Sequence, residues 1–262
     1  MQIKIDLNLA SVQQALRRAA DQVPFATSVA INKTVELARV EVVKTMRQVF
    51  DRPTPWVLNS LRVKRSTKTS LTADLGFKDR NSAESSRSMI EPHVFAGKRH
   101  NKAMEARLFR MGLLPAGYSA VPGKAAKIDS FGNMSQGQIT TILNVLGTYT
   151  EAGYNKANSN TVARFKRGNV KKNVYGFTYF VSPVGGAKGR HLQPGVYQRF
   201  QTAFGTSLKP VLIFVKQPKY KKTLPFFEVA QRTVNQEFPG QFNKAFDAAM
   251  KTALVKTQPN LL

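Results

Sequence analysis

The sequence has no cysteine among its 262 residues and no long apolar run. Without cysteine, a disulfide framework, a thiolate nucleophile and a cysteine-based zinc site are excluded. The longest clearly apolar run, Val211 to Val215, has five residues and is far too short to cross a membrane. Residues 1–8 alternate apolar and polar side chains, which predicts a short strand rather than a signal peptide. We therefore expect a soluble protein that is made in the cytoplasm.

Acidic residues are scarce. The chain has 40 Lys and Arg against 15 Asp and Glu, a formal charge of +25, and 42% hydrophobic residues, enough for a substantial core. Between Ala152 and Phe227 there are fourteen Lys or Arg and no Asp or Glu. An ordinary soluble surface mixes both signs, because a field of one sign destabilises the compact state by self-repulsion. The stretch is therefore expected to face a negative partner: nucleic acid, an acidic protein or an anionic membrane.

The usual constellations of catalytic and metal-binding residues are missing from the sequence. The three histidines share no metal-ligand spacing, so each is interpreted as a surface or structural residue: His93, His100 and His191. Two pairs of carboxylates stand near each other in sequence but are interpreted as capping or ion-pairing groups: Asp74 with Asp79, and Glu91 with Glu105. We expect no enzyme, no cofactor and no metal.

Residues 185–190 form a glycine-rich basic segment. They have Gly-Arg where a phosphate-binding loop needs Gly-Lys-Ser/Thr, so a flexible basic loop is the better interpretation. Such a loop can become ordered when it contacts a partner.

Hydrophobic periodicity predicts helices and strands along the whole chain. A short helix is expected at residues 11–21, and a second helix of about 25 residues starts at Pro24 and ends before Pro53. Two more are expected at 101–111 and, after an N-cap at Ser135, at 136–146. The last is one long helix that starts at Pro225 and is kinked at Pro239. Strands are expected at 61–65 and 71–77, which form a hairpin, and at 174–181, 195–200 and 210–216. Residues 79–92 are predicted to be a loop, and turns are predicted at 114–118 and 121–123.

This order predicts an α+β fold, in which an antiparallel sheet packs against long N- and C-terminal helices around a helical or loop insertion. We expect residues 1–92 to form the N-terminal strand, long helices and hairpin of the core. Residues 93–170 would be the helical, glycine-rich insertion, and residues 171–262 the C-terminal strands and long helix that complete the core.

The acid-free stretch supplies the candidate binding residues. They are expected to contact DNA or an acidic partner: Lys166, Arg167, Lys171, Lys172, Lys188, Arg190, Lys219, Lys221 and Lys222. Aromatic residues lie among these charges, as stacking platforms would, but most of them are interpreted as core residues: Phe165, Tyr175, Phe177, Tyr179, Tyr197 and Tyr220. No helix-turn-helix, zinc-finger or RNA-binding signature indicates sequence-specific recognition.

The turns of the C-terminal third resemble those of a known family. Residues 192–199 read Leu-Gln-Pro-Gly-Val-Tyr-Gln-Arg, residues 209–215 read Lys-Pro-Val-Leu-Ile-Phe-Val, and residues 218–220 read Pro-Lys-Tyr before a helix of Phe-x-x-x-Phe type. With residues 52–56, 114–117 and 122–123, these segments resemble tailed-phage tail-completion and neck proteins, specifically the minor tail protein Z-like family. These motifs are structural turns and carry no chemistry.

The resemblance implies a virion part near the head–tail junction, in a homo-oligomeric ring or attached to one. Its partners would be other neck and tail proteins such as the connector, the tail terminator or the tube, with non-specific contact to DNA in the lumen and no membrane contact. The function expected is that of a non-enzymatic structural protein in tail completion or head–tail joining. The alternative is a sequence-independent nucleic-acid-binding protein, such as a packaging or nucleoid-type factor, and an enzyme of DNA metabolism is the third hypothesis.

Overall fold

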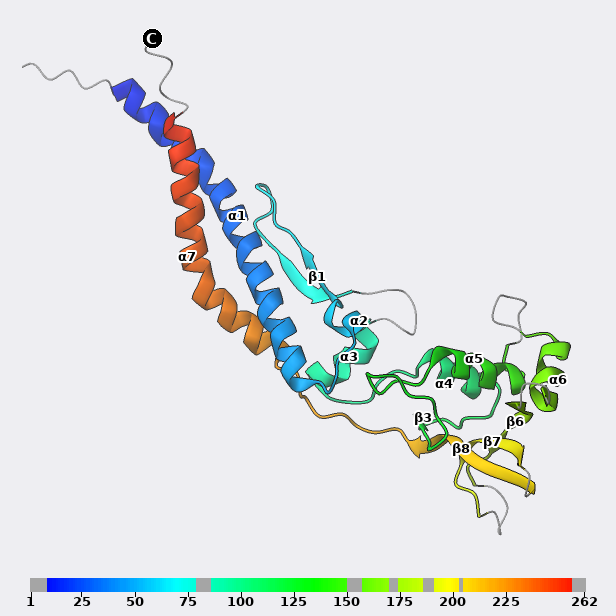
Figure 1. Cartoon of the computed structure of the whole chain (residues 1–262). Coiled ribbons are helices and arrows are strands. Elements are labelled where there is room, and N and C mark those ends of the chain that lie inside the picture. Colours follow the sequence, from blue (N-terminus) through cyan, green and yellow to red (C-terminus); the bar gives the residue numbers. More distant parts are fainter. Residues whose placement is uncertain are drawn as a thin grey trace, which may run out of the picture. The chain divides into compact units, whose positions relative to one another are not determined.

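The computed structural model describes residues 9–78, 86–149, 157–169, 174–185, 191–202 and 205–255 (Figure 1). The chain forms two compact units, one of residues Met1–Asp79 with Thr223–Leu262 and one of residues Arg80–Lys222. We call them the helical unit and the sheet unit. The α+β class is confirmed. The two units meet at residues 79–80 and 222–223, whereas the sequence predicted three parts with boundaries at residues 92–93 and 170–171. The strand expected at residues 1–8 lies outside the described residues.

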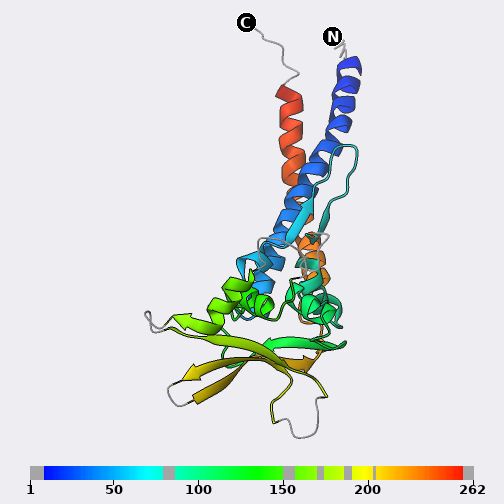
Figure 2. The same ribbon diagram turned by 90° about the vertical axis from the view of Figure 1, so that its right-hand side faces the viewer.

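Two long helices make up most of the helical unit. Helix α1 (Leu9–Val49) and helix α7 (Phe226–Val255) run side by side in opposite directions (Figures 1 and 2). A stripe of α1 is completely or almost completely buried and is rich in small side chains, which permit close packing: Ala26, Ala30, Ala38, Val42 and Met46. The single kinked C-terminal helix expected across Pro239 is confirmed as one continuous helix.

Helix α1 runs through Pro24, so the expected break between residues 21 and 24 is wrong. An interior proline removes one helical hydrogen bond and costs about 3 kcal/mol. Directly after it, Ala26 and Ala30 are completely buried. Burial of this stripe holds the helix together across the proline, and this is a tertiary effect that local sequence does not encode.

A hairpin lies along α1. Strands β1 (Leu61–Lys64) and β2 (Asp74–Phe77) pair antiparallel in the register Leu61 to Phe77, which confirms the predicted hairpin. One short helix, α2 (Pro55–Leu58), precedes them and is capped by the side chain of Thr54.

The sheet unit is built on four antiparallel strands in the order β3-β8-β7-β6. These strands are β3 (Tyr118–Pro122), β6 (Phe177–Ser182), β7 (Gly195–Thr202) and β8 (Gly205–Lys216). The strands expected at 174–181, 195–200 and 210–216 are present, with the first interrupted at Gly176. The turn expected at 121–123 is wrong in part, because residues 118–122 form an edge strand that pairs with β8. The predicted insertion therefore contributes a strand to the main sheet.

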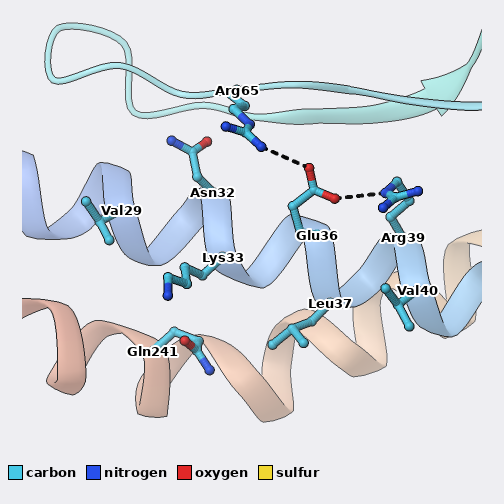
Figure 3. Close-up of a pocket in the computed structure, with 9 residues that line it drawn as sticks. All are labelled: Val29, Asn32, Lys33, Glu36, Leu37, Arg39, Val40, Arg65 and Gln241. Atoms are coloured by element: carbon cyan, nitrogen blue, oxygen red, sulfur yellow. Dashed lines mark hydrogen bonds and ion pairs between the residues drawn. The ribbon is translucent and has the colours of Figure 1, made fainter.

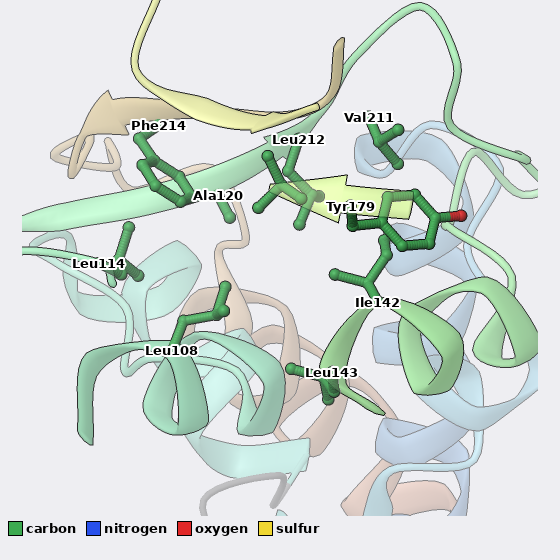
Figure 4. Close-up of a cluster of buried hydrophobic side chains, with 10 residues drawn as sticks. Leu108, Leu114, Ala120, Ile142, Leu143, Tyr179, Val211, Leu212 and Phe214 are labelled. Atoms are coloured by element: carbon green, nitrogen blue, oxygen red, sulfur yellow. The ribbon is translucent and has the colours of Figure 1, made fainter. Parts of the chain in front are cut away.

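Helices α4 (Ala103–Arg110) and α5 (Gln136–Val145) cover one face of this sheet. Their buried side chains meet the inner side chains of the strands in one cluster (Figure 4). Its members are Leu108, Leu114, Ala120, Ile142, Leu143, Tyr179, Val196, Val211, Leu212 and Phe214. The helix expected from residue 136 after Ser135 is confirmed, and Gly147 adopts a positive φ directly after its end.

Smaller elements complete the sheet unit. They are α3 (Ser86–Phe95), α6 (Ser159–Arg167), β4 (Gly168–Asn169) and β5 (Val174–Tyr175). The loop expected at residues 79–92 is wrong from residue 86 onward, where α3 buries Ile90 and Val94 one turn apart. Residues 79–85 lie outside the described part of the chain.

Candidate functional site

The described cations of the acid-free stretch are all exposed. We call these nine residues the basic surface: Arg164, Lys166, Arg167, Arg199, Lys209, Lys216, Lys219, Lys221 and Lys222. Five of the nine predicted contact residues belong to it: Lys166, Arg167, Lys219, Lys221 and Lys222. The other four, Lys171, Lys172, Lys188 and Arg190, lie outside the described residues.

The predicted contact residues of the basic surface form two groups rather than one cluster. Lys166 and Arg167 end helix α6, which packs on the start of β6. Through the register of β6, β7 and β8, this start lies level with Ser207. The second group begins after Lys216 at the other end of β8, nine residues further on, which is about 30 Å in an extended strand. A partner that contacts both groups must therefore follow the length of the sheet.

Two further cations lie on the middle strands, close to the level of Ser207 and therefore nearer to the first group than to the second. The Arg199 guanidinium lies over the ring of Phe180, 5.0 Å from its centre, and the Lys209 ammonium lies over the ring of Phe200 at 4.9 Å. Since Arg199 pairs with Leu208 and Lys209 with Gln198, the two cations project from opposite faces of the sheet. The aromatic rings position these cations without neutralising them.

Carboxylates do not balance this charge. The sheet unit has 23 Lys and Arg against 5 Asp and Glu. With the exception of Lys222, no member of the basic surface forms an ion pair with an acid in the described part of the chain. The positive field of these side chains is therefore directed at solvent or at a partner.

One of the few acids of this unit is buried. Glu105 is completely inaccessible, and both of its carboxylate oxygens accept hydrogen bonds from Arg99, at 2.6 and 2.7 Å. Burial opposes its ionisation, but hydrogen bonds from Arg99 and from the backbone N–H groups of Lys102 and Ala120 outweigh that effect and lower the pKa of Glu105. The ion-pairing role expected for Glu105 is confirmed.

The aromatic residues among the charges are divided by their burial. Tyr179 and Tyr197 are buried, Phe165, Phe177 and Tyr220 are half-buried, and Tyr175 is 58% exposed. Burial in the core is confirmed for Tyr179 and Tyr197, whereas Tyr175 is an exception to a prediction that covered most of these residues but not all. Sequence alone could not separate them, because their burial depends on how α6 and the strands pack.

The histidines do not form a catalytic group in the structure. His93 lies in α3, 5.0 Å from the ring centre of Tyr220, and burial lowers the pKa of its imidazole. His100 and His191 are exposed. Over the described ranges, no three His, Asp or Glu side chains are grouped so that they could hold a metal ion.

A groove of about 550 Å³ lies in the helical unit, along α1 (Figure 3). It is lined by Val29, Asn32, Lys33, Glu36, Leu37, Arg39, Val40, Arg65 and Gln241. Hydrogen bonds from Arg39, at 2.8 Å, and Arg65, at 3.4 Å, lower the pKa of Glu36 against a smaller effect of burial. Because its one carboxylate is held ionised by two arginines, Glu36 is not a proton donor at neutral pH.

Comparison with known proteins identified no relative: no protein family, no curated protein and no solved structure matches this chain. Among the described helices, none combines the length and the apolar character that a membrane span requires.

Proposed function

We propose that this chain is a non-enzymatic structural protein of a tailed bacteriophage virion. It would act in tail completion or head–tail joining, with the basic surface of its sheet unit directed at DNA or at acidic partner subunits. The observation that carries the proposal is that all nine described cations of an acid-free stretch are exposed on a folded sheet unit. Such a surface gains free energy when a polyanion displaces its counterions.

The segments that resemble the phage family support the same proposal through their position. Residues 192–199 and 209–215 contribute to β7 and β8, the two central strands of the sheet. Val196, Leu212 and Phe214 face the core, whereas Arg199 and Lys209 are exposed. The motif thus builds the framework on which the basic surface is displayed, as expected of an assembly protein.

The experiment that tests this proposal compares assembly with free DNA binding. We expect the purified chain to form rings in negative-stain images, or to co-purify with tails in lysates of the producing cell. A salt-titrated DNA shift assay on the same sample measures the contribution of phosphate contacts. A small soluble species that binds DNA with a steep salt dependence and never associates with virions would contradict the structural role.

A second function is favoured by one specific observation. Tyr175 is exposed beside the cations of α6, a combination typical of proteins that bind nucleic acid without sequence preference. Under this alternative the chain acts as a free packaging or nucleoid-type factor. The same pair of assays separates the two functions.

A further inference from the structure

Tyr175 is the most exposed aromatic side chain described in the sheet unit after Phe95, and its backbone lies next to the end of helix α6. It pairs with Gly168 across the short β4–β5 ladder, and in such a pair the Cα atoms are about 5 Å apart. Gly168 directly follows Arg167, the last residue of α6. The backbone at Tyr175 and the end of α6 are therefore adjacent, and the side chains of Tyr175, Lys166 and Arg167 are all exposed there.

Helix α6 is held firmly in this place. The Asn158 side chain accepts the N–H of Thr161 at 2.8 Å and caps the first turn. The ring of Phe165 stacks on that of Phe177, with 5.8 Å between centres and 20° between planes. These contacts occupy the apolar side of α6, and leave Arg164, Lys166 and Arg167 exposed at its C-terminal turn.

The simplest alternative explains only part of this arrangement. Cations in the last turn of a helix interact favourably with the helix dipole, and this alone would justify basic residues there. It does not explain an exposed tyrosine ring beside them, since exposure of a large aromatic surface forgoes the free energy of its burial. A ring and several cations on one surface together fit a ligand that has both a flat aromatic part and negative charges.

We propose that Arg164, Lys166, Arg167 and Tyr175 form a binding subsite for single-stranded nucleic acid. An unpaired base stacks on the Tyr175 ring, and the three cations bind the phosphates on either side of that base. Stacking tolerates any base, which agrees with the absence of sequence-reading motifs. This inference rests on the polyanion-binding role proposed for the basic surface, and it names the ligand of one part of that surface.

An acidic protein is a poorer fit to this subsite. Protein interfaces bury an apolar centre surrounded by a polar rim. Here the apolar side chains of α6, Val162 and Phe165, are half-buried toward the sheet unit, and the exposed side chains are cations, Tyr175 and small or polar groups. A single ring among cations suits base stacking better than it suits a protein contact.

The test uses the full chain with Tyr175→Ala, Tyr175→Phe and, as a matched control, Phe131→Ala. Phe131 is also an exposed aromatic residue, by 41%, but it lies beside an acid instead of cations: its backbone N–H donates to the carboxylate of Asp129. A phosphate chain is therefore not expected to bind next to its ring. Fluorescence anisotropy would measure binding to a thymidine oligonucleotide and to a duplex of the same length, each over a salt titration. We expect Tyr175→Ala to weaken oligonucleotide binding about tenfold, with little change in salt slope or duplex binding. Tyr175→Phe and Phe131→Ala should bind as the wild type does.

Several results would overturn the proposal. One is a Tyr175→Ala variant that binds the oligonucleotide as tightly as the wild type. Another is an equal loss on oligonucleotide and duplex, which would indicate a general defect rather than loss of stacking. If the wild type binds neither nucleic acid but binds polyglutamate, the subsite is wrong while a basic surface for acidic partners survives. If it binds none of these polyanions, the proposed role of the basic surface fails as well.

Discussion

Glu105 and Arg99 form a two-point ion pair whose carboxylate is completely buried. The same carboxylate accepts the backbone N–H of Lys102, at the start of α4, and that of Ala120, in β3, both at 2.8 Å. The carbonyl of Arg99 in turn accepts the side-chain amide of Gln217, directly after β8. One ion pair thus joins a helix start, an edge strand and the end of the strand beside it.

Replacement of Glu105 by glutamine should destabilise the sheet unit by about 3–5 kcal/mol, because it leaves the Arg99 charge buried without a counter-charge. All seven tyrosines lie between residues 80 and 222, and the one tryptophan, Trp56, lies outside this range. Urea unfolding in a Trp56→Phe background, followed by tyrosine fluorescence, would therefore report on the sheet unit. A Glu105→Gln variant with an unchanged unfolding midpoint would contradict this role.

Two variants provide the controls for this experiment. Glu41→Gln removes an exposed ion pair with Lys44, 3.5 Å long, in the helical unit, and should leave the tyrosine-detected unfolding midpoint of the sheet unit unchanged. The double variant Arg99→Met/Glu105→Leu removes both charges and should be more stable than Glu105→Gln, because no unpaired charge remains. A double variant less stable than the single one would show that the backbone N–H groups of Lys102 and Ala120, which lose their acceptor, matter more than the unpaired charge.

His93 should make the sheet unit less stable as the pH falls below about 6.5. Burial lowers the pKa of His93 from its ordinary value of 6.5, so the unfolded chain takes up a proton there at a higher pH than the folded chain does. The histidine therefore contributes stability above pH 6.5, and this contribution is lost as the pH falls toward its folded pKa.

The variant His93→Phe keeps a ring beside Tyr220 but cannot titrate. Its melting temperature, measured between pH 7.5 and 5, should fall less steeply than that of the wild type. The difference between the two proteins should begin at about pH 6.5. His100→Gln, at an exposed position, is the control and should follow the wild-type curve. If His93→Phe and wild type have parallel curves, the pH dependence arises at other groups.

The sequence predicted the elements whose pattern is local. Alternation and turn residues indicated the hairpin and the central strands, and the apolar stripe of α7 indicated a helix that continues through Pro239. The failures at α1, α3 and β3 share a cause. Pro24, the serine-rich start of α3 and the prolines around β3 all disfavour the observed element locally, and burial against other parts of the same unit overrides them.

The candidate site was predictable in charge but not in geometry. The acid-free stretch is a property of composition, so the basic surface could be read from the sequence. The division of its contact residues into two groups depends on the register of β6, β7 and β8, which the sequence pattern does not determine. The same holds for Tyr175 and Tyr179, four residues apart, of which one is exposed and the other buried.

The β1–β2 hairpin should loosen when its contact with α1 is removed. Asn32 accepts the backbone N–H of Ser66 at 2.8 Å and donates to its carbonyl at 3.1 Å, and Ser28 also bonds to Ser66. We expect Asn32→Ala to cost about 1–3 kcal/mol locally, since it leaves part-buried backbone groups of Ser66 unsatisfied. Hydrogen exchange of the hairpin amides should become faster, whereas Thr69→Ala, at the exposed tip, should leave it unchanged. Equal protection in Asn32→Ala and wild type would mean that other contacts hold the hairpin.

Gly176 should not tolerate a side chain, because the end of α6 passes over it. A Cβ atom at this position would collide with the backbone carbonyl of Lys166 and lie 2.8 Å from the carbonyl carbon of Arg167. Backbone atoms of a docked helix cannot move aside as a flexible side chain can, so Gly176→Ala should displace α6 and disturb the subsite at Tyr175.

Gly137→Ala is the matched control: a Cβ atom there meets nothing within 4 Å, and in helix α5 alanine should stabilise by about 0.5–1 kcal/mol. We therefore expect opposite shifts of the two variants in urea unfolding, and weaker oligonucleotide binding for Gly176→Ala alone. A Gly176→Ala variant as stable as the wild type would show that α6 does not press against this residue.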